Sequence, residues 1–287
     1  MYIDSNFTIR ENLDGKYIII HANQLKEGII YAEKVKMPQI QLRGVLGNDC
    51  ADMAVDFSEF EKLTSTLKII SFTDEIDNII NFESIYSLEN IEKIYIQHKQ
   101  KFNMDVSLFP KLKHLGSECW NGLKNINNAS GLASLVIYKY AGINLENISN
   151  LKKLQLLHIY SSKIKTLNGI EELPIKELFL VKNNYLENLN DIQKMKSIKI
   201  LHIEKCKKII DFSFLVNNKT IESLFISDVD SFNFIPSMKN INALRFWNLQ
   251  DGNLNYLLAS ATLKYVDYYP QKNNYTHKKE EINKLIN

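Results

Sequence analysis

The sequence predicts an α/β repeat: a solenoid with a concave parallel sheet, an N-terminal β-hairpin cap and a short C-terminal helical cap. Two observations lead to this fold class. A six-residue pattern, apolar-x-x-apolar-x-apolar, recurs along most of the chain. The two ends lack this pattern and carry a hairpin signal and a helical signal instead. Repeats that cannot bury their apolar face alone must stack on one another, and such a stack needs a cap at each end.

Nine copies of the six-residue pattern follow one another at nearly constant spacing. Their intervals are 21, 20, 22, 21, 23, 23, 20 and 22 residues, and they begin at Ile91, Leu112, Leu132, Leu154, Ile175, Ile198, Ile221, Ile241 and Leu263. An earlier copy begins at Leu67, and a candidate degenerate copy, followed by a long insertion, begins at Met37. A repeat of this length holds one strand and its return segment, so the spacing predicts a solenoid.

These repeats resemble the leucine-rich-repeat family over residues 55–270. Within residues 163–180 a second apolar set follows the strand, and it resembles the short repeat of bacterial internalins and related intracellular regulators: Ile164, Leu167, Ile170 and Leu173. Heavy use of Ile, Asn and Lys is typical of an AT-rich genome and favours a bacterial source. The resemblance implies strands on a concave side, irregular turns on the convex side and recognition of another protein.

The chain departs from the family at the ninth position of the repeat, where an Asn side chain usually bonds to loop backbone. Only Asn183 matches, with Ser162 and Cys206 as partial substitutes, and the other places hold Trp120, Tyr140, Val229 and Leu249. We therefore expect uneven loops and no regular asparagine ladder.

The ends predict two caps and a three-part division of the chain. Residues 7–22 contain two strand-like runs around an Asp-Gly turn, which indicates a β-hairpin. Residues 276–287 begin with Thr276 as a candidate N-cap and carry Ile282, Leu285 and Ile286 at helical spacing. The predicted parts are 1–54, the N-terminal cap with the degenerate copy; 55–270, the solenoid; and 271–287, the C-terminal cap.

The third and fifth residues of each hexad, and the residue after its end, are predicted to project from the concave sheet, because strand side chains alternate between faces. Two of these columns are rich in aromatic residues, as exposed binding surfaces are. The candidate partner-binding residues are Tyr95, Tyr138, His158, Tyr160, Phe179, His202, Phe225, Arg245, Trp247 and Tyr269. The alternative is that these large side chains only shield the sheet and contact one another.

The sequence predicts no enzyme, no catalytic residue, no cofactor and no metal site. It holds no phosphate-binding glycine loop, nucleophile elbow or zinc-protease motif. His158 and His202, with Glu177 and Glu204 nearby, form the most tempting constellation. However, Phe179 is predicted to separate the two histidines, which is poor geometry for a zinc site. Cys50, Cys119 and Cys206 are too few and too far apart for a disulfide framework, and Cys119 is more simply a buried thiol.

Charge and hydropathy narrow the class of partner. The 35 basic and 33 acidic residues leave a formal charge of +2, and the lysines are scattered along the sequence, so nucleic acid is not expected. The N-terminal residues lack a signal-peptide pattern, and no apolar run is long enough for a membrane span, so we expect a cytoplasmic protein that is monomeric when free. Secretion by a route that needs no signal is the alternative.

The role expected from these features is recognition of a partner protein on the concave face. An immunity protein that neutralises a bacterial toxin is the most concrete form of this hypothesis. The alternatives are a secreted effector that engages a host protein, and a scaffold or regulatory subunit for an enzyme supplied in trans.

Overall fold

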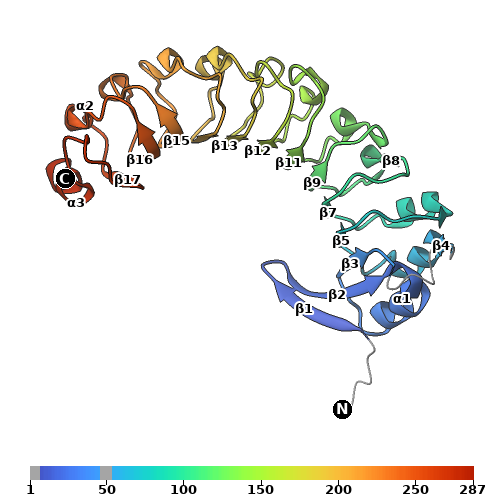
Figure 1. Cartoon of the computed structure of the whole chain (residues 1–287). Coiled ribbons are helices and arrows are strands. Elements are labelled where there is room, and N and C mark those ends of the chain that lie inside the picture. Colours follow the sequence, from blue (N-terminus) through green and yellow to red (C-terminus); the bar gives the residue numbers. More distant parts are fainter. Residues whose placement is uncertain (1–6, 46–53) are drawn as a thin grey trace. The chain divides into compact units, whose positions relative to one another are not determined.

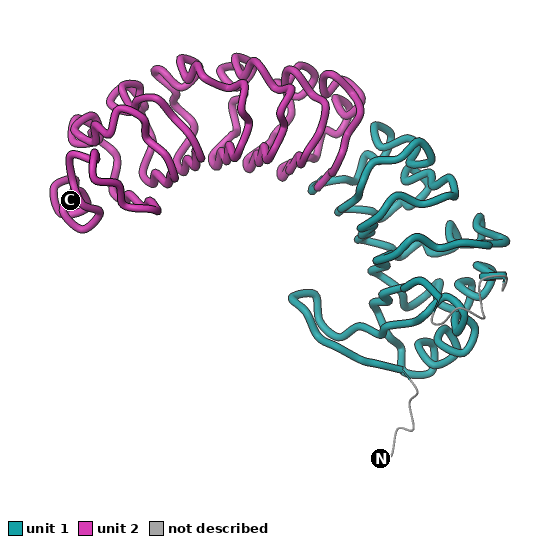
Figure 2. The backbone as a smooth tube through the Cα atoms, in the orientation of Figure 1, with its two compact units in different colours: residues 1–135 teal, residues 136–287 magenta. Residues whose placement is uncertain are grey.

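The computed structural model of the chain describes residues 7–45 and 54–287. Cys50 and part of the predicted N-terminal cap region therefore lie outside the described residues. The chain divides into two compact units, residues 1–135 and 136–287, which Figure 2 shows in different colours. Each unit is a stack of repeats built on parallel strands.

The sheet of unit 1 follows the order β1-β2-β3-β5-β7-β9. These strands are Thr8–Asn12, Gly15–His21, Gln39–Arg43, Ile69–Phe72, Lys93–Ile96 and His114–Glu118. β1 pairs with β2 antiparallel, and every later neighbour in this order pairs in parallel. The hairpin predicted over residues 7–22 is thus present. The degenerate copy at Met37 also forms a strand, β3, in register between β2 and β5.

A helix that the sequence pattern does not predict, α1 (Leu25–Lys34), covers the end of unit 1. It follows the hairpin directly and buries Leu25, Ile29 and Ala32. Gly28 allows the helix to approach β2 closely, because a Cβ there would lie 2.6 Å from the Ile20 side chain. The tip of the hairpin contacts β7, where Lys93 pairs with Asp14 and the Tyr95 hydroxyl donates to the same carboxylate at 3.4 Å.

The return segments of unit 1 form short 3₁₀ turns and two small parallel pairs. β4 (Val55–Asp56) pairs with β6 (Ile79–Ile80), and β8 (Met104–Asp105) pairs with β10 (Leu123–Lys124). The 3₁₀ turns are Phe57–Leu63, Phe82–Ser87, Val106–Leu108 and Ile126–Asn128. Phe57, Phe72 and Phe82 contribute to an aromatic core under these turns, with ring centroids 5.4–6.4 Å apart.

In unit 2 the strands follow chain order, and neighbouring strands from β12 to β17 pair in parallel. The strands are β12 (Leu156–Tyr160), β13 (Glu177–Val181), β14 (Ile200–Glu204), β15 (Ser223–Val229), β16 (Ala243–Leu249) and β17 (Tyr265–Tyr268). β11 (Ser134–Tyr138) carries the division between the units. Within unit 2 the strands line the inner side of a curve, and the 3₁₀ turns lie on its outer side (Figure 1). Those turns are Glu146–Ile148, Asn190–Lys194, Ser213–Leu215 and Ile235–Ser237.

The first, fourth and sixth positions of all nine hexads are buried, as the pattern predicts. The central leucines Leu157, Leu178 and Leu201 have no exposed surface, and Tyr268, at the last of these positions, is 3% exposed. Each strand therefore gives alternate side chains to the core and leaves the others for the opposite face of the sheet.

The loops that follow the strands are uneven, as the ninth positions predicted. Asn183 is fully buried: its side-chain oxygen accepts from Ser162 N, and its amide donates to Ile159 O, both at 2.9 Å. Ser162 Oγ in turn accepts from Tyr140 N at 3.0 Å. In unit 1 the Trp120 indole donates to Phe102 O at 3.0 Å instead. A different side chain therefore secures the backbone in each of these repeats.

The C-terminal end of unit 2 carries α2 (Asn255–Leu258) and α3 (Lys279–Leu285). The predicted helical cap is present, but two details differ. The N-cap is Lys278, whose backbone N–H donates to Glu281, whereas Thr276 lies two residues before it and accepts from Leu254 N at 3.0 Å. Ile282 is buried, whereas Leu285 is 55% exposed. The three-part division of the sequence stays a prediction. Among the helices of the described residues, none combines the length and apolar character needed to cross a membrane.

Candidate functional site

Side chains of the fifth hexad position form one row across the sheet of unit 2. Parallel pairing places His158 opposite Phe179, Phe179 opposite His202, and His202 opposite Phe225. Residues of the seventh position, just after each hexad, lie beside them. We call the following set the aromatic row: Tyr138, His158, Tyr160, Phe179, His202, Phe225 and Trp247.

The rings of the aromatic row stack on one another along the sheet. The Phe179 and His202 planes differ by 5° with centroids 4.5 Å apart, and the His202 and Phe225 planes differ by 12° at 4.1 Å. Tyr138 and Tyr160 form a second stack at 4.6 Å. Strand spacing of about 4.8 Å sets this distance. Face-to-face contact uses the ring faces within the row, so the ring edges remain for a partner.

The far end of the row differs, because Trp247 meets Phe225 edge to face at 5.2 Å. The Lys205 ammonium lies 5.4 Å from the Trp247 ring centroid, a cation–π contact. Tyr138 is 43% exposed, whereas His158, Tyr160, Phe179, His202, Phe225 and Trp247 are half-buried. The rings of the row thus pack against one another, and one side of the row is open to solvent.

Two carboxylates accompany the histidines of the row. His158 Nε2 lies 2.7 Å from Glu177 Oε1, and His202 Nε2 lies 3.1 Å from Glu204 Oε2. Burial lowers the pKa of His202, and the bond to Glu204 opposes that shift. Burial has the opposite effect on the Tyr160 hydroxyl and raises its pKa. Burial therefore favours the neutral form of the His202 imidazole, which stacks between the Phe179 and Phe225 rings.

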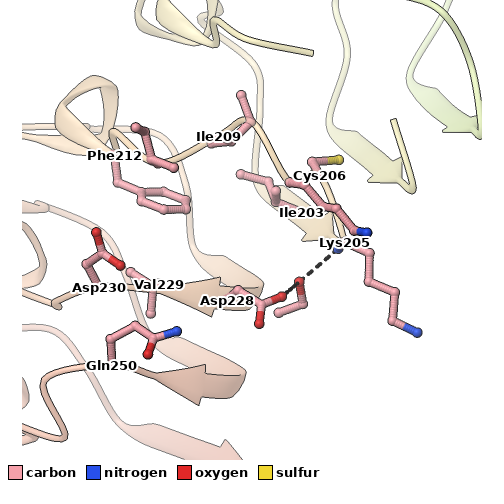
Figure 3. A pocket seen from close by; sticks show the side chains of 12 residues that line it. Ile203, Lys205, Cys206, Ile209, Phe212, Asp228, Val229, Asp230 and Gln250 are labelled. Carbon is pink, nitrogen blue, oxygen red and sulfur yellow. Dashed lines mark hydrogen bonds between the residues drawn. The ribbon is translucent and has the colours of Figure 1, made fainter. Parts of the chain in front are cut away.

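An apolar pocket of about 340 Å³ opens at the edge of the sheet where β14 and β15 end (Figure 3). Its apolar lining includes Cys206, Ile209 and Phe212. Two acidic residues, Asp228 and Asp230, and two basic residues, Lys205 and Lys207, also line the pocket. Lys205 N donates to Ser227 Oγ at 2.8 Å, which joins the two loops. Ile210, in the same pocket, is 75% exposed.

Comparison with known proteins rests on structure, because no family model and no curated protein matches the sequence. An internalin from Listeria monocytogenes is similar in structure with a TM-score of 0.51 and 12% identity, over 89% of this chain and 82% of that one. The chain is a leucine-rich-repeat solenoid. The stacked parallel strands and the buried hexad positions agree with this fold, so the resemblance drawn from the repeats is confirmed.

Two further structures are similar at lower scores. A leucine-rich-repeat protein of Leptospira interrogans has a TM-score of 0.43 and 14% identity, over 82% of this chain and 79% of that chain. The leucine-rich-repeat domain of the type III effector XopL has a TM-score of 0.42 and 12% identity, over 76% and 71%.

The solenoid does not bring all the predicted site residues together. Tyr95 belongs to unit 1, where its ring contacts His114 at 4.8 Å and its hydroxyl reaches the hairpin. Arg245 lies opposite Phe225 in the fifth-position row, but it adds a guanidinium in place of a ring and packs over Tyr265 at 5.8 Å. Tyr269 is 79% exposed beyond the end of β17. The other seven predicted residues form the aromatic row.

The described residues hold no group of three or more His, Cys, Asp or Glu side chains arranged to bind a metal ion. Burial raises the pKa of the Cys119 thiol to about 12, with Glu118 adding to the shift, and burial raises that of Cys206 to about 11. Both thiols are thus held in the protonated, unreactive form. Cys206 Sγ instead donates to Leu180 O at 3.4 Å, the place that Asn183 takes in the preceding repeat.

Sequence reasoning missed one set of surface residues. Lys182 and Lys205 both occupy the eighth position of their repeats, and Lys163 and Lys207 both occupy the tenth. These lysines are scattered along the sequence, but a repeat of 21–23 residues brings the four to one edge of the solenoid, where they line a common groove. A count of lysines at each repeat position would have found them.

Proposed function

We propose that this leucine-rich-repeat solenoid is a protein-binding module without enzymatic activity, and that it holds its partner on the aromatic row of unit 2. The observation that carries the proposal is a stack of rings that is half-buried on its own sheet and open on the other side. Exposed apolar surface of this kind is unfavourable in water and is typical of binding surfaces. Ring edges and two glutamates then offer a partner both apolar contact and hydrogen bonds.

The size of the row suits an interface of ordinary dimensions. A stable complex buries about 800 Å² on each partner, which corresponds to several neighbouring repeats of a solenoid. Most of the binding energy in such an interface comes from a few aromatic or Arg residues. We propose that Tyr160, Phe179 and Trp247 are those residues here, since Tyr160 and Phe179 lie on neighbouring strands inside the row and Trp247 lies at its end.

Site-specific photocrosslinking tests which side of unit 2 the partner covers. A benzophenone amino acid is placed at Tyr138, which is 43% exposed on the sheet, or at Val216, which is 44% exposed beside the 3₁₀ turn Ser213–Leu215. The two positions are equally accessible, so exposure alone cannot separate them. The proposal expects one protein adduct, from position 138 only, in a lysate of the source cell. Adducts from position 216 alone, or equal yields from both, would show that the row is not the binding face.

The captured partner, once purified, allows affinity to be measured. Changing Tyr160, Phe179 or Trp247 to Ala is expected to weaken binding by about 2 kcal/mol or more each, which is roughly 30-fold. The matched control is Tyr256→Ala, because Tyr256 lies on α2 beside the 3₁₀ turn Ile235–Ser237 and away from the sheet. Circular dichroism must show that all four variants are folded. Equal binding by all of them means that the rings only shield the sheet.

The narrower role that we propose is that of an immunity protein, monomeric when free, that neutralises a bacterial toxin in the cytoplasm. Support comes from its open recognition face. A secreted effector acting on a host protein and a scaffold for an enzyme supplied in trans are the alternatives. The crosslinked partner separates the three: a toxin whose activity the solenoid abolishes, a host protein, or a cellular enzyme that stays active in the complex.

A further inference from the structure

The edge of unit 2 beside the aromatic row carries a basic groove of about 400 Å³. We call it the lysine groove, and its lining residues are Ser161, Ser162, Lys163, Lys182, Asn184, Tyr185, Lys205 and Lys207. It shares Lys205 and Lys207 with the apolar pocket. Because Lys205 also contacts Trp247 of the aromatic row, the groove and the row are parts of one continuous surface.

The four lysines of the groove lack the carboxylate partners that other lysines of unit 2 have. Lys199 pairs with Glu222 at 2.6 Å and Lys208 pairs with Glu187 at 2.5 Å. In the part of the chain that the structure describes, no carboxylate lies within ion-pair distance of the groove lysines. Four like charges in one groove repel one another, and a bound anion relieves that repulsion.

The backbone under the groove is fixed by contacts between repeats. Ser161, Lys182 and Lys205 have φ angles of 50°, 55° and 52°, in the left-handed region. Each donates its N–H to the next repeat: to Val181 O at 2.9 Å, to Glu204 O at 2.8 Å, and to Ser227 Oγ at 2.8 Å. The anchor points of the lysines are therefore ordered before any ligand arrives, which lowers the entropy lost on binding.

We propose that the lysine groove binds a short carboxylate-rich segment of the same partner protein that the aromatic row recognises. This extends the proposed function to the chemistry of the partner. The exposed Tyr185 hydroxyl, Asn184 and Ser161 add donors for carboxylate oxygens. The groove spans the repeats that begin at Leu154, Ile175 and Ile198, which is about 10 Å across the strands, enough for a few acidic residues.

The limits of the groove favour a short acidic peptide over a nucleic acid. In the next repeat, Asp228 and Asp230 occupy the eighth and tenth positions, where the preceding repeat has Lys205 and Lys207. A polyanion that continues along this edge would meet these two carboxylates and be repelled. A segment of a few residues can end before it reaches them.

The test uses a fluorescein-labelled decaglutamate peptide as the probe and fluorescence anisotropy at low salt as the readout. The groove variant carries Lys163→Glu, Lys182→Glu and Lys207→Glu, and it keeps Lys205 so that the contact with Trp247 survives. The control variant carries Lys196→Glu, Lys219→Glu and Lys239→Glu, three exposed lysines outside the groove that give the same change in net charge. Matching melting curves establish that both variants fold.

The proposal expects the wild type and the control variant to bind the peptide and the groove variant to bind it at least about tenfold more weakly, because close charge pairs dominate screened electrostatics. Equal losses in both variants, or no binding by the wild type, overturn it. A single-stranded oligonucleotide of the same charge that binds the groove more tightly than the peptide also overturns it, in favour of a nucleic acid. Since the probe needs no aromatic contact, the outcome is independent of whether the aromatic row binds a protein.

Discussion

Replacing Asn183 by Ala should destabilise the solenoid far more than any change at its neighbour. Asn183 is fully buried, and its side chain joins the backbone of two repeats through bonds to Ser162 N and Ile159 O. Alanine removes both bonds, leaves a buried donor and a buried acceptor without that partner, and opens a small cavity. Each unsatisfied group costs about 1–3 kcal/mol, so we expect a loss of about 3 kcal/mol in the free energy of unfolding.

The matched control for this prediction is Asn184→Ala. Asn184 is exposed, and its side chain has no hydrogen bond to the described residues that supports the loop, so the same chemical change there should alter stability by less than about 0.5 kcal/mol. Ser162→Ala should fall between the two, because it removes the acceptor for Tyr140 N but keeps the Asn183 bonds. The expected order of destabilisation is therefore Asn183, then Ser162, then Asn184.

Urea unfolding followed by circular dichroism measures this order, and hydrogen exchange at the Ser162 amide reports the local loss of protection. Local measurement matters because repeat proteins can unfold in parts, and a single midpoint then hides where stability was lost. If Asn183→Ala unfolds within about 0.5 kcal/mol of Asn184→Ala, the buried amide does not hold the repeats together and the reasoning fails.

Two further predictions concern the N-terminal hairpin and the pH dependence of stability. Deleting residues 7–22 removes Ile18 and Ile20 from the core and uncovers β3, so melting temperature and solubility should both fall; a monomeric truncated protein with an unchanged melting temperature contradicts this. Because the pKa of His202 is lower in the folded state than in the unfolded one, its contribution to stability is present above the unfolded pKa of about 6.5 and is lost as pH falls through it toward the folded value. His202→Gln should therefore make the free energy of unfolding less dependent on pH below about 6.5, and an unchanged slope in urea titrations would count against it.

The sequence was most informative where burial leaves a periodic trace. Leu157, Leu178 and Leu201 recur at repeat spacing because stacked strands must all bury the same position. The same alternation correctly assigned His158 and Phe179 to the opposite face. The pattern gave no information on ring orientation, since the stacking of Phe179 between two imidazoles depends on side-chain torsions that a strand leaves open.

Features that depend on a single contact left no such trace. The hydroxyl of Tyr275 accepts from Leu249 N at 3.1 Å and so supplies the loop contact that the ninth position of that repeat lacks, from 26 residues away. The pairing of Asp14 with Lys93 joins residues 79 positions apart. The helix α1 occurs once and lies outside the repeat, so the repeat pattern does not predict it. A contact that occurs only once leaves no periodic pattern in the sequence from which it could be predicted.

The period that produced the core also explains why the two surface features lie next to each other. In each repeat, side chains of the fifth and seventh positions lie on the sheet and those of the eighth and tenth follow at its edge, so Glu204 and Lys205 are adjacent in the chain and belong to different surfaces. A ring at one position and a lysine at the other are therefore repeated side by side over several strands. Composition could not reveal this, because a net charge of +2 averages Lys182 and Lys205 with carboxylates on other sides of the solenoid. In a repeat protein, the informative unit of charge is the column at one repeat position, and Lys182 and Lys205 stand in such a column where they line the groove.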